Sequence, residues 1–204
     1  MKAEDIIASE DFQKCVDFHG HLCPGLSMGY RASQAGMEWL ESERAADEEI
    51  VAIVETDACC ADAVQVITGC TFGKGNFIYQ DHGKMAFTFL SRESGKGVRI
   101  ALKSDTVPRD QRHMDLIKKI QTNSASDAEQ KEFKKLHEKR SFEILEKPIN
   151  SLFNLKEVNI ELPPKAKIEP SKSCERCGEP TMASKLCKVK IRVLRARLWS
   201  TPEG

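Results

Sequence analysis

The sequence predicts an α+β fold, in which helices pack on a mixed β-sheet, followed by a small C-terminal domain. Segments with helical and with strand character are mixed without a strict β–α–β alternation, and this favours α+β layers. The chain has 204 residues, 40% of them hydrophobic, which is enough for one domain of about 150 residues and an appendage. The net charge is zero, but residues 165–204 contain ten Lys or Arg and four Glu, so they carry +6 and the preceding residues −6.

Two helices are expected at the start of the chain. Residues 4–17 place Ile6 and Phe12 near one face of a helix. A second helix begins at Pro24, because proline has no N–H group to lose in the first turn, and apolar residues follow at helical spacing as far as Leu40.

The middle of the chain is expected to form the sheet. Residues 49–56 are rich in β-branched side chains and predict a buried strand, after which Asp57 caps a short helix. Residues 76–79, 84–92 and 97–103 are short, apolar and separated by glycines, and they predict successive hairpin strands.

Two further helices and a last strand complete the predicted core domain. Pro108 begins one helix. Ser126 and Glu129 form a capping box ahead of a long helix that continues through Leu145. Residues 157–162 predict the last strand.

The domain boundary is expected where the charge changes sign. Pro163, Pro164 and Pro170 lie in a polar stretch, a composition typical of a stiff, extended linker. We therefore expect a core domain at residues 1–162, a linker at 163–173 and a small domain at 174–204.

Composition also limits where the protein works. The N-terminus has neither the basic nor the apolar stretch of a secretory signal, and apolar stretches such as Ile50–Val54 are far shorter than the roughly 20 residues that span a bilayer. We expect a cytoplasmic protein that does not enter a membrane. Because cytosolic thiols are kept reduced, eight cysteines indicate metal binding or thiol chemistry rather than disulfides.

The strongest candidate site is the string FHGHLCPG, in which His19, His21 and Cys23 fall directly before a helix start. The positive end of a helix dipole favours a thiolate and neutral imidazoles, which are the forms that bind soft or borderline metals or act as nucleophiles. The alternative is that both histidines only form hydrogen bonds within the loop.

A second candidate segment has Cys59, Cys60 and Asp62 at the start of the helix that follows the first strand. Ligands and catalytic groups often lie where a strand leads into a helix. If the two helix starts converge, Cys59 joins Cys23 and the histidines around one cavity, and mixed nitrogen and sulfur ligation with an open fourth position is typical of catalytic zinc. The alternative is that the adjacent cysteines are small apolar fillers, above all Cys60.

The glycine-rich loop at residues 69–76 contains Cys70 and Lys74. Its spacing differs from that of a P-loop, and it leads from a helix into a strand, so we do not interpret it as one. An anion-binding backbone nest beside Lys74 remains an alternative. Asp81 and His82 either line the same cleft or belong to a solvated turn.

The C-terminal segment contains a zinc knuckle. Cys174 and Cys177 are separated by two residues, and Gly178 permits the tight turn that directs both sulfurs at one ion. Cys187 is the expected third ligand, and the fourth is Glu179, a residue of the core domain or of another subunit, or a water molecule. So small a domain would take much of its folding free energy from the metal. The alternative is that no metal binds.

Residues 188–193 alternate charged and apolar side chains, as expected for an edge strand with a basic outer face. Nucleic-acid contact is one interpretation. We prefer a solvated strand, because the chain is neutral as a whole and only Trp199 offers a stacking surface nearby.

Three separated motifs together resemble the FmdE family of formylmethanofuran dehydrogenase proteins: FHGHLCPGLSMGYRAS, then CCADAVQVITGCTFGKGN with the DHGK that follows, and the terminal CERCGE. The resemblance is dense over residues 12–90 and returns at 174–179. It implies a thioredoxin-like α+β core, a treble-clef zinc finger and an association with the molybdenum or tungsten enzyme of one-carbon metabolism. It also implies an active site lined by His19, His21, Cys23, Cys59, Asp62, Cys70 and Lys74.

The sequence departs from the family pattern in its finger. The family finger usually closes with a second C-x-x-C, whereas only Cys187 is present here, so the finger is atypical or borrows its fourth ligand. Cys60 lies where the family motif does not require cysteine and is a secondary candidate.

We therefore expect a metal-binding protein with a structural zinc in the C-terminal domain and a second metal, zinc or another divalent ion, in the core. An open position on the core metal would polarise a carbonyl or activate water in a one-carbon or amide-like substrate. The expected core ligands are His19, His21 and Cys59, with Cys23 as a thiolate or close neighbour and Asp62 as an orienting carboxylate.

Two other functions and several partners follow from the same observations. A non-catalytic accessory or regulatory module, whose finger binds a protein or nucleic acid, is the second hypothesis. A redox role for Cys23 or Cys59 ranks last, because the core domain has no C-x-x-C pair. We expect a homodimer, since a symmetry mate most easily supplies a missing zinc ligand. Subunits of a molybdenum or tungsten dehydrogenase are candidate partners, and nucleic acid is not expected.

Overall fold

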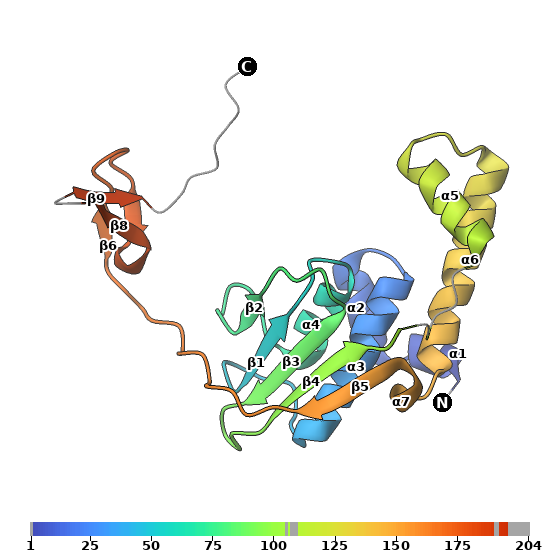
Figure 1. Ribbon diagram of the computed structural model, residues 1–204, viewed down its shortest axis with the longest axis horizontal. Helices are drawn as coiled ribbons and strands as arrows, with labels where there is room; N and C mark the ends of the chain where they lie inside the picture. Colours follow the sequence, from blue (N-terminus) through green and yellow to red (C-terminus); the bar gives the residue numbers. More distant parts are fainter. Residues whose placement is uncertain (1, 105, 107–109, 190–191, 196–204) are drawn as a thin grey trace. The chain divides into compact units, whose positions relative to one another are not determined.

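The computed structural model describes residues 2–104, 106, 110–189 and 192–195, and the side chains of residues 187–189 and 192–195 are outside this description. The chain forms two compact units, Met1–Lys165 and Ala166–Gly204, and every strand pairing of the described residues lies within one of them (Figure 1). Among the described residues, no helix is both long and apolar enough to cross a membrane.

The first unit is built on a five-stranded mixed sheet flanked by helices, which confirms the predicted α+β fold class. The strands are β1 (Ile50–Val54), β2 (Phe77–Tyr79), β3 (Ala86–Ser91), β4 (Gly97–Leu102) and β5 (Phe153–Glu157). Their order in the sheet is β2-β1-β3-β4-β5. Only the β1–β2 pair is parallel, and the other neighbours are antiparallel.

The predicted hairpin at residues 76–79 is wrong, because β2 does not pair with the strand that follows it. It pairs in parallel with β1, with Ile78 opposite Ile53. The chain then passes the end of β1, where the Lys84 N–H donates to the carbonyl of Glu55 at 3.0 Å, and returns on the other side of β1 as β3. A three-residue strand carries too little pattern to predict this crossing.

Different parts of the chain bury the two faces of the sheet. Because side chains alternate along a strand, Ile50 belongs to the main core, whereas Ile53 belongs to a smaller cluster on the opposite face. Val158 and Leu162 pack against that smaller cluster. The strand predicted over residues 157–162 is therefore wrong: the last strand of the first unit is β5, which begins four residues earlier and ends at Glu157. Residues after it cover a face of the sheet.

The helices of the first unit are α1 (Ala3–Ile7), α2 (Glu10–His19), α3 (Pro24–Leu40), α4 (Cys60–Thr68), α5 (Gln111–Gln121), α6 (Asp127–Glu146) and α7 (Ile149–Leu152). The start of α3 at Pro24 is as predicted. This helix is central to the main core, in which it packs on the sheet against Phe87 and Phe89 of β3 (Figure 1).

Two predicted helix boundaries are wrong. The helix expected over residues 4–17 is divided, because Ser9 has an extended backbone and its hydroxyl accepts the Phe12 N–H at 3.4 Å, so that α2 begins after it. Asp57 does not cap α4. The N-cap is Cys59, whose side chain makes no capping hydrogen bond.

Helices α5 and α6 form a helical hairpin. Pro108, the predicted start of the first of these helices, lies outside the described residues, and α5 begins after Asp110, whose carboxylate accepts the Arg112 N–H at 2.9 Å. The predicted capping box at the start of α6 is confirmed, with Ser126 and Glu129 each accepting the other's backbone N–H.

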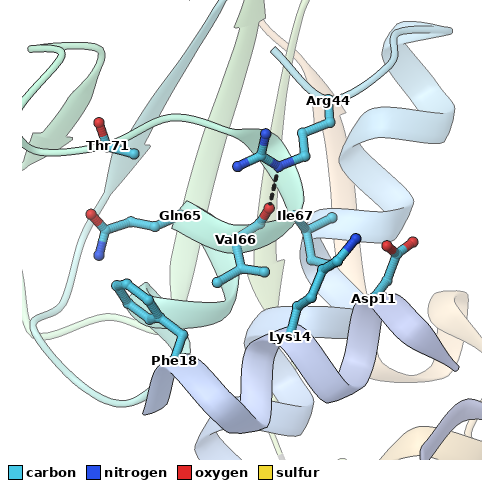
Figure 2. A pocket seen from close by; sticks show the side chains of 8 residues that line it. All are labelled: Asp11, Lys14, Phe18, Arg44, Gln65, Val66, Ile67 and Thr71. Atoms are coloured by element: carbon cyan, nitrogen blue, oxygen red, sulfur yellow. Dashed lines mark hydrogen bonds between the residues drawn. The ribbon is translucent and has the colours of Figure 1, made fainter. Parts of the chain in front are cut away.

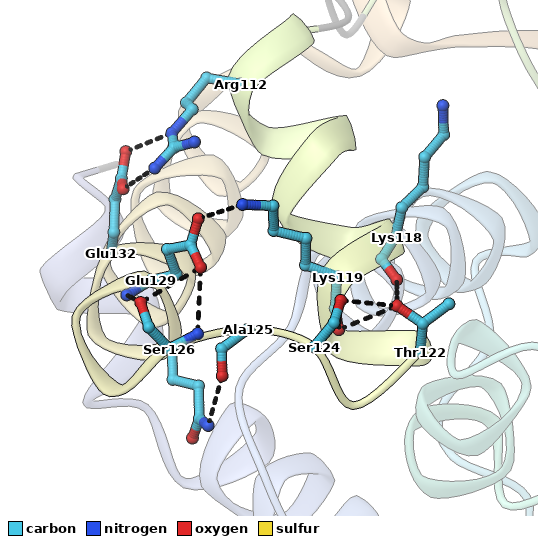
Figure 3. A network of polar contacts seen from close by, with 10 residues as sticks. Arg112, Lys118, Lys119, Thr122, Ser124, Ala125, Ser126, Glu129 and Glu132 are labelled. Atoms are coloured by element: carbon cyan, nitrogen blue, oxygen red, sulfur yellow. Dashed lines mark hydrogen bonds and ion pairs between the residues drawn. The ribbon is translucent and has the colours of Figure 1, made fainter.

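Two ion pairs join the helices of this hairpin, Lys119 with Glu129 and Arg112 with Glu132 (Figure 3). Exposed pairs of this kind contribute only about 0–1 kcal/mol each. The hairpin therefore also depends on apolar contacts such as those of Leu116, which is fully buried.

The second unit consists of short strands. β6 (Ser171–Ser173) pairs with β7 (Pro180–Met182), and after the 3₁₀ turn η1 (Ala183–Lys185) β8 (Leu186–Val189) pairs with β9 (Arg192–Arg195). The single strand predicted over residues 188–193 is wrong, because this segment is shared between β8 and β9, which run antiparallel. Residues 190–191 lie outside the described part of the chain.

Helices α3 and α4 approach each other closely because glycines of α3 face the start of α4. A Cβ atom on Gly29 would lie 2.3 Å from the carbonyl oxygen of Cys60, and one on Gly25 would lie 3.0 Å from the Cβ of Cys59. The distance at Gly29 leaves no room for a side chain, and the distance at Gly25 is tighter than ordinary contacts. The two glycines therefore determine where the first residues of α4 lie relative to α3.

We expect Gly29→Ala to destabilise the protein. The added methyl group meets backbone atoms of α4, which cannot rotate away, and overpacking of this kind costs about 1–3 kcal/mol, more than the roughly 1 kcal/mol that alanine gains in helix propensity. Thermal and urea denaturation should show a lower Tm and midpoint. Gly73→Ala is the matched control, because nothing lies within 4 Å of its added Cβ. Equal stabilities of the two variants would contradict the close contact.

Candidate metal centre

His19, His21 and Cys23 lie in the turn between α2 and α3. Helix α2 ends at His19 because Gly20 adopts a left-handed conformation, with φ of 95°. Cys23 is the N-cap of α3, and its sulfur accepts the Leu26 N–H at 3.3 Å. The turn thus places two imidazoles and a thiol beside one helix start.

The three side chains are close enough to hold one ion. One ligand atom from each residue can be chosen so that all three atoms lie within 4.8 Å of one another. The Nε2 of His19 is 3.7 Å from the sulfur of Cys23, and the ring centroids of His19 and His21 are 4.6 Å apart. Ligands of a tetrahedral zinc ion at about 2.0–2.3 Å are separated by roughly 3.3–3.8 Å, so small side-chain rotations complete the geometry.

Asp62 holds His19 in the orientation that metal binding requires. Its carboxylate oxygen lies 2.7 Å from the Nδ1 of His19. Since a carboxylate can only accept, Nδ1 carries the hydrogen, and the lone pair of Nε2 is directed toward Cys23. A carboxylate behind a histidine is the usual arrangement at zinc sites. The bond also links α2 to α4.

Cys59 lies beside Cys23, where the starts of α3 and α4 meet. The contact of Gly25 with the Cβ of Cys59 brings the second helix start against the first. Cys59 is among the groups that raise the pKa of Cys23, through its charge and a hydrogen bond. The structure therefore brings together His19, His21, Cys23, Cys59 and Asp62.

Burial opposes the expectation that the helix dipole makes Cys23 a thiolate. Burial raises the pKa of its thiol to about 11, and the Leu26 N–H lowers it only in part. The side chain is 3% exposed, so the loss of water outweighs the positive helix end. A metal must displace this proton in order to bind the sulfur.

Cys60 is packed away from its neighbour. It is fully buried in the main core, its thiol lies 3.7 Å from the carbonyl oxygen of Ala58, and burial raises its pKa to about 12. These are the properties of a small apolar filler.

Cys70 and Lys74 lie at the other end of α4. The thiol of Cys70 donates to the carbonyl of Ile50 at 3.3 Å, and the Lys74 ammonium donates to the carbonyl of Asp47 at 2.9 Å. Both partners are at the beginning of β1 or just before it, whereas Cys59 precedes α4. Because α4 has nine residues, its ends are separated by about 13 Å. The structure does not bring Cys70 or Lys74 to the histidine cluster.

The knuckle of the second unit has the expected tight turn. Gly178 has a φ of 74°, and its N–H donates to the carbonyl of Cys174 at 2.7 Å. Cys174 is buried and Cys177 is exposed. The thiol of Cys177 lies 3.3 Å from a carboxylate oxygen of Glu179. The side chain of Cys187 lies outside the described residues. Among the described side chains, His19, His21 and Cys23 are the one group of three that could hold a metal.

A second histidine pair lies in the helical hairpin and escapes prediction from the sequence. His113 of α5 and His137 of α6 approach with Nε2 and Nδ1 3.1 Å apart. Burial, followed by the charges of His113, His21 and Arg140, lowers the pKa of His137 to about 4. The charge of His21 thus acts on the pKa of a residue of α6. The only signal in the sequence is that histidines are few, five in all.

Fold and site define an α+β protein with a histidine–cysteine group at a helix start that could hold a metal ion. Residues 18–154 match the sequence profile of a family described as FmdE, Molybdenum formylmethanofuran dehydrogenase operon. The chain belongs to this family.

Two known proteins are similar to the chain. One is a Syntrophus aciditrophicus protein, described as like the FmdE component of a tungsten formylmethanofuran dehydrogenase; its crystal structure aligns with a TM-score of 0.56 over 90% of this chain and 87% of that one. At 24% identity it shows the fold alone. The other, from Archaeoglobus fulgidus, is named a probable S-adenosyl-L-methionine-binding protein and is 36% identical over 180 residues. These cover 85% of this chain and 49% of the relative, so the chain spans about half of its length.

We expect His137 to make the stability depend on pH between about 6.5 and 4. Its pKa is lowered in the folded state, so the unfolded chain takes up the proton first, and the stability present above pH 6.5 is lost as the pH falls toward 4. Urea denaturation at pH 7.5, 6 and 5 should show a smaller loss for His137→Gln than for the unmodified protein. His82→Gln, in an exposed loop, is the control, and its stability should fall with pH as much as that of the unmodified protein. Parallel losses in all three proteins would contradict this prediction.

Proposed function

We propose that the first unit binds one zinc or other divalent ion through His19, His21 and Cys23, with Cys59 as a further ligand or close neighbour. The observation that supports this most strongly is the approach of three ligand atoms to within 4.8 Å in a single turn. Imidazole nitrogen and thiolate sulfur are the donors that zinc prefers.

The surroundings of the three residues fit such an ion. Asp62 keeps the hydrogen of His19 on Nδ1, so that Nε2 is free to bind. Cys23 is buried, whereas His21 is exposed, so the open side of the centre faces solvent on the His21 side. A ligand from solution would approach from there.

A zinc ion bound with an open position would polarise a carbonyl or activate a water molecule of a one-carbon or amide-like substrate. The chain itself would orient the His19 ring and keep water away from the Cys23 sulfur. Asp62 and the α2–α3 turn fix His19, and the packing of α3 on α4 excludes water from Cys23.

In the second unit, we propose a structural zinc on Cys174, Cys177 and Cys187. The tight turn at Gly178 supports this, because it allows both sulfurs of the knuckle to face one ion. Family membership supports a metal-related accessory role in the context of formylmethanofuran dehydrogenase. Subunits of a molybdenum or tungsten dehydrogenase and a second copy of this chain are the partners we propose.

A binding module without turnover is the second candidate, and the name of the A. fulgidus relative favours it. S-adenosyl-L-methionine is accordingly a ligand to test on the full chain by isothermal titration calorimetry. Saturable binding would support this role, and absence of heat at millimolar ligand would oppose it.

Elemental analysis tests the two metal sites. We expect two zinc equivalents per chain, one of which is lost in His21→Ala with Cys59→Ser, and the other in Cys174→Ser. His82→Ala is the matched control and should retain both. Unchanged metal content in His21→Ala with Cys59→Ser would overturn the core site.

Asp62→Asn should weaken zinc binding at the core site about 10–100-fold while leaving stoichiometry at saturating zinc unchanged, because the carboxylate orients His19 without binding the ion itself. Competition with a chromophoric chelator measures this affinity. Asp57→Asn, in the segment before α4, is the control. An affinity equal to that of the unmodified protein would show that Asp62 does not support the centre.

A further inference from the structure

A pocket of about 520 Å³ lies between α2 and α4, beside the proposed metal centre (Figure 2). Its walls include Lys14 and Phe18 from α2, Val66 and Ile67 from α4, and Arg44 from the loop after α3. The volume is that of a site for a small organic molecule. None of these residues has a role in the metal centre.

Arg44 presents a fixed guanidinium to this pocket. Its Nε–H donates to the carbonyl of Val66 at 2.8 Å, which holds the plane of the group. In Figure 2 the two terminal nitrogens extend away from this bond, over the pocket, and no acceptor among the described residues contacts them. A planar guanidinium with two free N–H groups binds a carboxylate or phosphate through two parallel hydrogen bonds.

One cation of the pocket, Arg44, has no ion-pair partner among the described residues. Lys14 and Arg44 are its cations and Asp11 its one acidic residue, while the other lining residues are neutral. Glu10 already pairs with Lys14 at 2.8 Å, so Arg44 is the main anion ligand. The hydrogen bond and the charge of Glu10 raise the pKa of Lys14, so this ammonium is already partnered.

The opposite wall is apolar. Phe18 is 59% exposed, although it is a large aromatic residue, and Val66 and Ile67 lie on the facing helix (Figure 2). An exposed aromatic ring beside aliphatic side chains is a surface on which a flat apolar group can pack. The pocket therefore combines a site for an acidic group with a site for an apolar body.

The apolar end is the one nearer to the metal centre. Phe18 directly precedes His19, whereas Lys14 is a turn further back on α2. On α4, Val66 follows Asp62 by four residues, which places their Cβ atoms about 6 Å apart. The His19–Asp62 bond joins the same two helices that form the pocket.

We propose that the α2–α4 pocket binds a small organic anion, with its carboxylate or phosphate on Arg44 and its apolar body on Phe18. This defines the substrate class of the metal centre, and in that respect it rests on the proposed function. The binding itself needs no metal, because no pocket residue belongs to the centre.

The test is an NMR titration of the isotope-labelled full chain with four probes: benzoate, phenyl phosphate, acetate and benzylamine. Benzoate or phenyl phosphate should shift the backbone amides of Phe18, Val66 and Thr71 saturably, and the tighter of the two identifies the acidic group. Acetate should bind more weakly because it lacks the apolar body, and benzylamine should cause no shifts. If all four probes cause no shifts at these amides, the proposal is overturned.

Variants assign the two halves of the site. Arg44→Gln should raise the Kd of benzoate at least about tenfold, as expected for a lost charge-assisted hydrogen bond. Phe18→Ala should raise the Kd of benzoate and leave the Kd of acetate unchanged. The matched controls are Arg112→Gln and Phe72→Ala, the latter a ring that is 81% exposed outside the pocket, and both should bind as the unmodified protein does. An unchanged Kd in Arg44→Gln would overturn the proposal.

Failure of this inference can be told from failure of the proposed function. Arg44→Gln should retain both zinc equivalents, and His21→Ala with Cys59→Ser should retain benzoate binding. Zinc binding without any probe binding would overturn the anion pocket alone. Probe binding in a protein whose core takes up no zinc would overturn the metal function and, with it, the assignment of the anion as substrate.

Discussion

The contact between the glycine face of α3 and the first residues of α4 is the constraint on which the candidate site depends. Without side chains at residues 25 and 29, the backbone of α4 can approach to distances at which any Cβ would overlap Cys59 or Cys60. This contact brings a helix start that follows β1 against a helix start that follows α2. The centre is therefore assembled from two chain segments about 40 residues apart, by packing rather than by local sequence.

Burial and hydrogen bonding act in opposite directions on the groups of this centre. Burial raises the pKa of the Cys23 thiol, because the loss of water disfavours the thiolate more than the hydrogen bond from the helix N-terminus favours it. Asp62 does the reverse for His19, since it fixes the ring in the tautomer that can bind a metal. The ring of His19 is thus oriented, whereas burial favours the protonated form of the Cys23 thiol.

The sequence is informative about this protein where the chemistry is local. His19, His21 and Cys23 fall within one turn, so their proximity follows from spacing alone, and the capping box at Ser126 follows from a four-residue pattern. The fold class followed from the mixture of elements, and family membership from three motifs. Each of these predictions needed only residues that are neighbours in the chain or a pattern repeated along it.

What could not be predicted depends on contacts between distant segments. The parallel pairing of β2 depends on how the chain rounds the end of β1, which a three-residue strand cannot encode. The distance of Cys70 from the cluster follows from the length and direction of α4. His137 pairs with His113 of another helix, and no motif marks either residue. The ionisation of Cys23 could not be inferred either, since burial is a property of the packed core.

The hydrogen bond between His19 and Asp62 has a thermodynamic consequence. It crosses from α2 to α4, the two helices that also enclose the cavity of Figure 2. If a molecule bound there changed the spacing of these helices, it would act on this bond and on the orientation of the His19 ring. Linkage then requires reciprocity: whatever factor the occupant imposes on metal affinity, the metal imposes on the occupant.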